Sequence, residues 1–201
     1  MLDAAEAVIH EHGIAELTLD AVAARAGVSK GGLMYHFKSK DLLLRAMVER
    51  IVDNWRRDCA AAIDALPPGP GRVAKGVLSL CLERPDCGGE DMRRSGIVLV
   101  TALASNPTLI SPLRDAHTDL LKKARRDGLA PGASETVVLA LSGLWFERIF
   151  GLSEMTPARR KHLLESLRGI AAPPAVPASR SAATKPRTRS KPRTRSRTRQ
   201  P

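Results

Sequence analysis

Residues 18–43 read TLDAVAARAGVSKGGLMYHFKSKDLL, and this stretch is the most informative part of the sequence about the fold. Its pattern predicts two short helices, at residues 20–26 and 30–37, separated by a tight turn. Gly27 allows the positive φ that such a turn needs, and Ser29 is a good N-cap for the second helix. Two short helices joined in this way are typical of a DNA-binding helix-turn-helix, whose second helix enters the major groove.

The apolar residues of this stretch indicate which side of each helix is buried. Leu33 and Phe37 lie four residues apart and should face the core, and Val28 should pack between the two helices. Ala23 and Ala24 are small enough for the helices to cross closely. The opposite side of the second helix, which is mostly polar, is then left for DNA.

The rest of the body also reads as helix after helix. The first helix should end at Gly13, and a long helix at residues 40–66 should end at the Pro- and Gly-rich stretch that follows. Pro and Gly residues separate the further predicted helices, at 72–84, 92–104, 112–127, 134–152 and 157–170. Nowhere does a two-residue alternation persist for the length of a strand, so the predicted fold class is all-α.

Composition excludes several classes of protein. Hydrophobic residues make up 43% of the 201, which excludes a wholly disordered chain. No apolar run approaches the roughly 18 residues that a membrane span needs. The N-terminus has no basic region before an apolar run, so we expect no secretory signal. Three cysteines cannot all pair within one chain, and a reducing cytoplasm is the simplest interpretation.

The positive charge of the chain is concentrated at its C-terminal end. The net charge is +11, but residues 173–201 hold nine basic residues and no acid, and subtracting these nine leaves +2 for residues 1–172. The motif KPRTRS occurs twice in succession, at 185–190 and 191–196. This composition predicts a disordered tail that binds DNA nonspecifically by releasing counterions. A tail that only aids solubility is the alternative.

The beginning of the chain resembles the N-terminal domain of the tetracycline-repressor (TetR) family of bacterial transcription regulators. The resemblance covers roughly residues 1–46 and rests on AGVSKG at 26–31, LMYHF at 33–37 and KSKDLL at 38–43. It implies a helix-turn-helix domain at residues 1–46, followed by a helical bundle.

The bundle that the resemblance implies, at residues 47–172, binds a ligand and forms a homodimer. The dimer implies a palindromic double-stranded DNA operator, and the ligand is a small-molecule inducer that releases the protein from it. Repression is the usual mode of the family. The basic tail at residues 173–201 would add nonspecific affinity for DNA.

The resemblance also implies which residues face DNA. Hydroxyl groups near helix N-termini hold phosphates, and lysines neutralise their charge. The predicted set is Thr18, Ser29, Lys30, Gly31, Gly32, Met34, Tyr35, His36 and Lys40. The two glycines have no side chain to read base edges, so base reading falls to Lys30 and Met34, and we expect DNA shape to contribute. Core packing is the alternative for Tyr35, and a packing or helix-end role is the alternative for His36.

The bundle resembles a multidrug-responsive subgroup of the same family. The similar residues are SGLWF at 142–146, FGL at 150–152 and Trp55. The predicted ligand-binding set is Trp55, Trp145, Phe146 and Glu147. Aromatic walls suit a hydrophobic or cationic ligand. Core packing is the alternative for the aromatic residues. Facing solvent, or pairing with Arg148 or Arg159, is the alternative for Glu147.

An enzyme and a DNA-compacting protein are the two alternatives to a regulator. An enzyme is disfavoured because the sequence holds no Gly-rich phosphate loop, nucleophile elbow, HExxH motif or paired cysteine ligands. We therefore expect no catalytic residue, no cofactor and no metal. A DNA-compacting protein that works through its tail would bind any DNA sequence alike.

Overall fold

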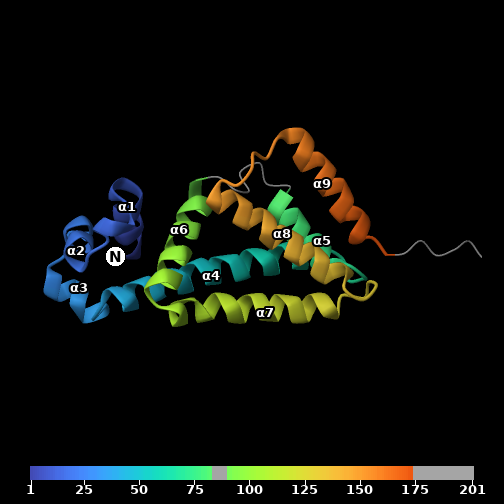
Figure 1. Ribbon diagram of the computed structural model, residues 1–201. Coiled ribbons are helices and arrows are strands. Elements are labelled where there is room, and N and C mark those ends of the chain that lie inside the picture. Colours follow the sequence, from blue (N-terminus) through green and yellow to red (C-terminus); the bar gives the residue numbers. More distant parts are fainter. Residues whose placement is uncertain (83–89, 174–201) are drawn as a thin grey trace, which may run out of the picture.

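The computed structural model describes residues 1–82 and 90–173 of the chain. Every regular element in these ranges is a helix, which confirms the all-α fold class (Figure 1). In chain order they are α1 (Leu2–His12), the 3-10 turn η1 (Ile14–Glu16), α2 (Leu19–Ala26), α3 (Lys30–His36), α4 (Lys40–Asp64), α5 (Arg72–Leu82), α6 (Glu90–Ser105), the 3-10 turn η2 (Pro107–Ile110), α7 (Ser111–Arg125), α8 (Ala133–Phe150) and α9 (Pro157–Ile170).

Several predicted boundaries differ from those of the structure. The long fourth helix ends at Asp64, two residues before the predicted end, and the 3-10 turns η1 and η2 were not predicted. η2 forms because Asn106 begins it, with its side-chain oxygen accepting a hydrogen bond from Thr108 N at 3.0 Å. The predicted extension of α5 to residue 84 and the predicted disorder of residues 174–201 lie outside the described residues.

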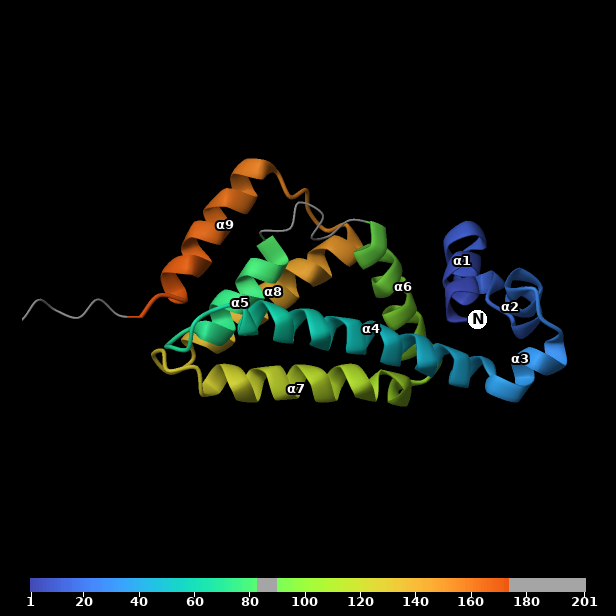
Figure 2. The ribbon, with the colours of Figure 1, turned by 180° about the vertical axis from the view of Figure 1, so that it is seen from behind.

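Helix α4 joins two parts of the molecule. Figures 1 and 2 show α1, α2 and α3 gathered at one end, which we call the head, and α5 to α9 gathered around the rest of α4, which we call the bundle. Ser39 caps α4 by accepting a hydrogen bond from Leu42 N at 3.2 Å. With 25 residues, α4 is about 37 Å long at a rise of about 1.5 Å per residue. A single rigid element therefore connects the head to the far end of the bundle.

The turn between α2 and α3 has the predicted conformation. Gly27 has φ of 67°, in the left-handed region, and Ser29 Oγ accepts a hydrogen bond from Gly32 N at 3.0 Å. Leu33 is fully buried and Phe37 packs partly buried against the same core. The prediction for Ala24 is wrong, since its side chain is exposed and only Ala23 lies in the crossing of the helices.

The buried residues form two clusters. One runs from the head along α4 to α6 and α7, and the other joins α5, α7, α8 and α9. Trp55 on α4 packs against both. Cys59 is buried as well, and desolvation raises the pKa of its thiol to about 11, so it serves as a small apolar residue. The core of the head is thus continuous with that of the bundle.

Two helix crossings depend on glycine. A Cβ added to Gly76 on α5 would lie 2.8 Å from the Cα of Ile63, and one added to Gly96 on α6 would lie 2.5 Å from Cγ1 of Ile149. Both distances are too short for carbon atoms. α5 can therefore lie directly against α4, and α6 directly against α8, only because these positions have no side chain.

A buried carboxylate holds the end of the bundle opposite the head. Asp127 follows α7, and its Oδ1 accepts a hydrogen bond from Val73 N at 2.8 Å. Its Oδ2 accepts hydrogen bonds from Ala74 N at 2.9 Å and from Ser134 Oγ at 2.8 Å. The backbone oxygen of Asp127 accepts a further bond from Gly71 N at 2.7 Å. This one residue therefore joins the end of α7 to the beginnings of α5 and α8.

An ion pair ties α9 to α8. Glu147 Oε2 lies 2.9 Å from Arg159 Nη2, and Ser153 Oγ donates a hydrogen bond to the same oxygen at 2.8 Å. The hydrogen bond from Ser153 and the pairing with Arg159 hold the pKa of the Glu147 carboxyl below its usual range. Pairing with Arg159, one of the alternatives for Glu147, is thus confirmed.

Replacing Asp127 by alanine should destabilise the protein by about 3 kcal/mol, because buried donors at the beginnings of α5 and α8 lose their acceptor. Urea unfolding followed by circular dichroism measures this. The control is Asp119→Ala, which removes an exposed carboxylate that pairs with Lys122 and should change stability by less than about 0.5 kcal/mol. Equal unfolding midpoints for Asp127→Ala and the wild type would contradict the role given to Asp127.

Replacing Glu147 by glutamine should lower the Tm at pH 7 by more than it does at pH 3. The folded-state pKa of Glu147 is depressed, so its stabilising contribution is present above the unfolded-state pKa of about 4.3 and is lost as the pH falls through the folded-state pKa. Thermal melts of both proteins between pH 3 and pH 7 test this. A difference in Tm that is the same at both ends of this range would show that the charge of Glu147 does not stabilise the fold.

Candidate nucleic-acid interface and ligand site

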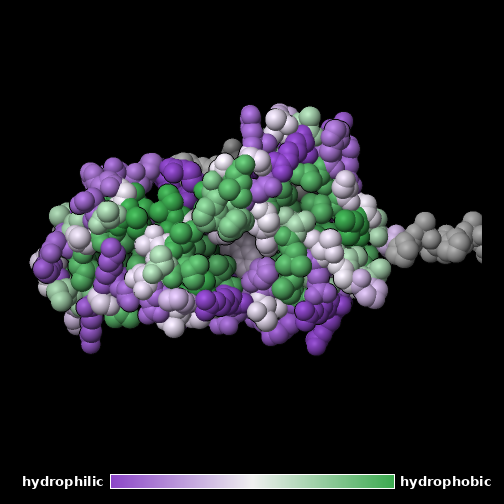
Figure 3. Space-filling view, in the orientation of Figure 1, coloured by the Kyte–Doolittle hydropathy of each residue, from purple (hydrophilic) through white to green (hydrophobic). Residues whose placement is uncertain are grey.

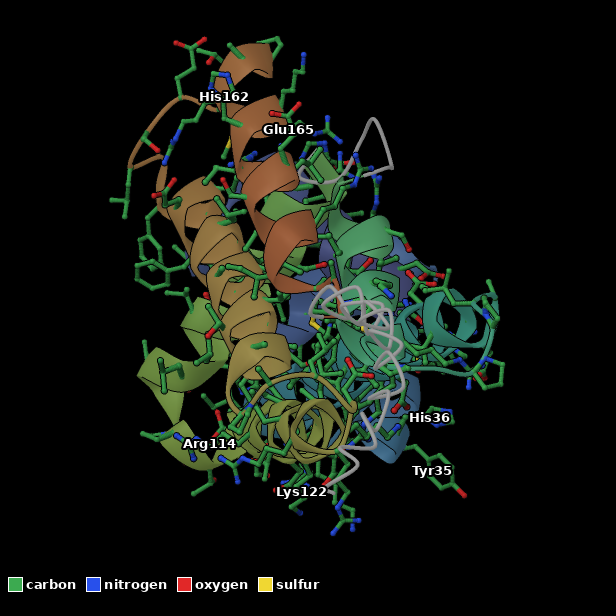
Figure 4. The ribbon with its side chains drawn as sticks, turned by 90° about the vertical axis from the view of Figure 1, so that its right-hand side faces the viewer. Tyr35, His36, Arg114, Lys122, His162 and Glu165 are labelled. Atoms are coloured by element: carbon green, nitrogen blue, oxygen red, sulfur yellow. The ribbon has the colours of Figure 1, made fainter. Side chains whose placement is uncertain are left out.

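Helix α3 presents one side to solvent and is anchored on the other. Leu33 is fully buried, while the side chains of Met34 and His36 are exposed and that of Tyr35 is 82% exposed. Figure 4 shows the Tyr35 ring pointing away from the molecule. The ring of Tyr35 meets that of His36 edge-on, with centroids 5.3 Å apart. Core packing, the alternative for Tyr35, is therefore wrong.

The two hydroxyl groups of the predicted DNA-facing set are helix caps. Thr18 Oγ1 accepts a hydrogen bond from Ala21 N at 3.1 Å at the beginning of α2, and Ser29 caps α3 in the same way. Because each oxygen is an acceptor in its cap, its hydroxyl hydrogen remains a donor. Both caps are exposed at the head, where a phosphate oxygen could accept these hydrogens.

The lysines and glycines of the set lie beside these caps. Lys30 begins α3 with an exposed side chain, and Lys40 begins α4 with a half-buried one. A Cβ added to Gly32 would lie 3.3 Å from Ser29 Oγ, so this glycine leaves room for the cap. Gly31 is exposed and has more space around it. The structure therefore brings all nine predicted DNA-facing residues to the head and the adjoining end of α4.

One charged residue of this surface was not predicted. Asp20 Oδ2 lies 2.9 Å from Lys30 Nζ, so a carboxylate accompanies the lysine that was expected to read bases. The two residues are ten positions apart, and only the packing of α2 on α3 brings them together. The signal in the sequence was the acid in the first turn of α2, which was open to a purely local interpretation.

The predicted ligand-binding residues separate into two groups. Trp55 and Trp145 are partly buried and pack against the core. Phe146 is 51% exposed and contacts Phe150, with ring centroids 4.4 Å apart and ring planes inclined at 38°. Glu147 is held by Arg159. The structure does not bring Phe146 or Glu147 together with the two tryptophans.

The bundle is hollowed on one face. Figure 3 shows a depression in the triangle between α6, α8 and α4, with hydrophobic atoms around its rim. A polar pair, which was not part of the predicted set, joins the neighbouring helices α7 and α8, with His117 Nε2 3.3 Å from Ser142 Oγ. The Ser142 hydroxyl also lies 3.0 Å from the backbone oxygen of Val138, to which it can donate.

The described residues hold neither a cluster of metal ligands nor a membrane-spanning helix. Within residues 1–82 and 90–173, no three His, Cys, Asp or Glu side chains gather closely enough to hold a metal ion. In the same part of the chain, no helix has the length and apolar character that crossing a membrane requires.

Comparison with known protein families places both parts of the chain. Residues 1–47 match the profile described as "Bacterial regulatory proteins, tetR family", and residues 71–172 match "Tetracyclin repressor-like, C-terminal domain". Among curated proteins, the chain is 36% identical over 69 residues to the HTH-type transcriptional regulator BetI of Klebsiella pneumoniae (strain 342). That match covers 34% of this chain and 35% of BetI, about a third of the length of each.

Solved structures share the fold over most of its length. The transcriptional regulator SCO7518 of Streptomyces coelicolor A3(2) superposes with a TM-score of 0.64 at 24% identity, covering 85% of this chain and 95% of that one. The multidrug binding protein EbrR complexed with malachite green has a TM-score of 0.60 at 24% identity, over 84% and 94%. The SmeT–triclosan complex has a TM-score of 0.59 at 24% identity, over 84% and 87%.

The family profiles and the geometry agree. One profile covers the head, with its capped α2 and α3, and the other covers the helices packed around α4. The chain therefore belongs to the TetR family of DNA-binding, helix-turn-helix transcriptional regulators.

Proposed function

We propose that the chain is a ligand-responsive repressor. It binds a palindromic operator as a homodimer, through residues 1–46, and a small hydrophobic or cationic molecule in the bundle of residues 47–172 releases it. The observation that carries the proposal is the exposed side of α3, with Tyr35 standing out from the surface, on a head joined rigidly to the bundle by α4. As a regulator that binds chromosomal DNA, the protein would be located in the cytoplasm.

On DNA, some residues of the head contact phosphates and others contact base edges. Thr18 and Ser29 donate to phosphate oxygens from their caps, and Tyr35 and His36 extend these contacts along the backbone. Lys40 adds positive charge at the beginning of α4. Lys30 reaches base edges, with Met34 in apolar contact. Because Gly31 and Gly32 add no side chain, the shape of the groove contributes to recognition.

An apolar stripe on α8 supports the homodimer. Leu139, Phe146 and Phe150 lie seven and four residues apart, so they share one side of the helix, and each is about half exposed. Gly143 lies on the same stripe with open space beyond it. Figure 3 shows hydrophobic atoms over α8 on this face. A second copy of the chain would cover such a stripe and place two heads on successive major grooves.

The ligand would enter the hollow between α4, α6 and α8. Trp55 and Trp145, which are partly buried against the core, would supply aromatic contacts to it, and the His117–Ser142 pair would supply a polar one. EbrR complexed with malachite green and SmeT complexed with triclosan, which share this fold, support a ligand in the bundle. A ligand that displaces α4 or α6 changes the spacing of the two heads, and about 1–3 kcal/mol of coupling is enough for release.

An operator search tests the DNA-binding role. Fragments of the organism's own DNA selected by the purified chain should contain one palindrome that is protected in a footprint. Lys30→Ala should weaken binding to it about tenfold or more, since base contact is lost. The control Lys161→Ala removes an exposed charge on α9 and should leave operator affinity unchanged. Binding that shows no preference among duplexes would reject the proposed operator.

A truncation that ends the chain at residue 172 tests the tail. Residues 173–201 would span at most about 100 Å if fully extended, far more than the length of α4, which is enough to reach DNA from the opposite end of the bundle. Removal should flatten the salt dependence of binding and weaken operator affinity while the footprint remains. An unchanged salt slope would show that the tail does not touch DNA, and loss of all binding would favour a DNA-compacting protein.

A further inference from the structure

An acid lies within the DNA-facing surface of the head. Asp20 is in the first turn of α2, two residues after the Thr18 cap, and its Oδ2 lies 2.9 Å from Lys30 Nζ. Both side chains are more than half exposed, at 65% and 59%. The pair therefore stands at the side of the head where the beginnings of α2 and α3 meet.

The charge of Asp20 matters more on DNA than in free solution. Duplex DNA carries about one negative charge for every 1.7 Å of its axis, and an unpaired carboxylate close to it is repelled. A carboxylate paired with a lysine forms a neutral unit instead, which releases no counterion from a phosphate. Lys30 can thus add nonspecific affinity only when it leaves Asp20.

The dipole of α2 alone does not explain the pairing. An acid in the first turn interacts favourably with the helix N-terminus wherever its side chain points. In this structure the Asp20 carboxylate turns toward α3, and the long Lys30 side chain extends back to meet it. The ammonium group is thereby held at the first turn of α2, close to the beginning of α3, which is the part of a recognition helix that approaches base edges.

We propose that Asp20 is a specificity-determining residue that positions Lys30. On random DNA the pair stays closed, and Lys30 makes no phosphate contact. On the operator, the ammonium group that Asp20 has held at the beginning of α3 meets a base acceptor such as guanine O6 or N7. Asp20 therefore suppresses nonspecific binding more than operator binding. The inference rests on the proposed function, because it assigns α3 to the major groove.

The test compares the full-length wild type with Asp20→Asn, Lys30→Met and the double variant. Each is titrated with the selected operator duplex and with a random duplex of the same length, at several salt concentrations. Asp20→Asn should bind the random duplex about tenfold more tightly at low salt and change operator affinity much less. Its salt slope on random DNA should steepen by about two per dimer, one added phosphate contact per subunit.

Lys30→Met separates positioning from net charge. The single variant Lys30→Met should have the same salt slope on random DNA as the wild type. The double variant, in which Lys30→Met is added to Asp20→Asn, should return to the wild-type salt slope. Asp53→Asn, which changes the net charge equally at an exposed site on α4, should leave the discrimination between the duplexes unchanged. The exposed position of Asp20 lets the variants fold, which the helical circular dichroism signal checks.

The outcomes distinguish this inference from the function on which it rests. If the wild type prefers the operator and Asp20→Asn prefers it equally, Asp20 does not determine specificity, although the regulator remains. The same conclusion follows if Lys30→Met flattens the slope on random DNA while Asp20 is present. If the wild type prefers no duplex at all, the proposed function and this inference are both wrong.

Discussion

The arrangement of the bundle depends on burying one charge. A carboxylate removed from water is costly unless donors surround it, and Asp127 has three on its side chain, supplied by Val73 N, Ala74 N and Ser134 Oγ. Those donors come from segments far apart in the chain. They reach Asp127 only when α5, α7 and α8 meet at the end of the bundle opposite the head. Satisfying this carboxylate therefore sets the positions of three helices around α4.

At its other end the bundle contacts the head through two helices. α4 enters the head directly, and its Arg50 pairs with Glu6 of α1, with Nη2 2.6 Å from Oε1. α6 reaches the head through Arg94, whose Nη2 lies 2.8 Å from Nε2 of His10. Ser105 of α6 also donates to Asp41 Oδ1 at 3.1 Å, in the first turn of α4. A ligand in the hollow between α4, α6 and α8 would press on both helices that hold the head. In the proposed release from DNA, α4 and α6 would therefore connect the ligand to the head directly, without intervening helices.

The sequence predicted best what is decided locally. The cap at Ser29, the turn at Gly27 and the exposed side of α3 follow from residues a few positions apart. Asp20 and Asp127 were missed as functional or structural centres because Lys30 is ten residues from Asp20, and the backbone donors of α5 are more than fifty residues from Asp127 along the chain. An acid beside a helix end has a sufficient local explanation, so nothing in the sequence points to a distant partner.

Helix α8 shows why the ligand-binding residues were harder to predict. Val137, Val138 and Leu141 are buried on one side, while Leu139 and Phe146 are exposed on the other, so the helix is apolar nearly all round. Periodicity cannot tell which side faces a neighbour within the chain and which faces a second copy. Trp145 and Phe146 are adjacent in sequence and therefore about 100° apart around the helix axis, so one is partly buried and the other is exposed. In the proposed dimer, the same helix would contact the ligand on its inner side and the partner on its outer side. Any shift of α8 that the ligand causes would then reach the spacing of the two heads directly.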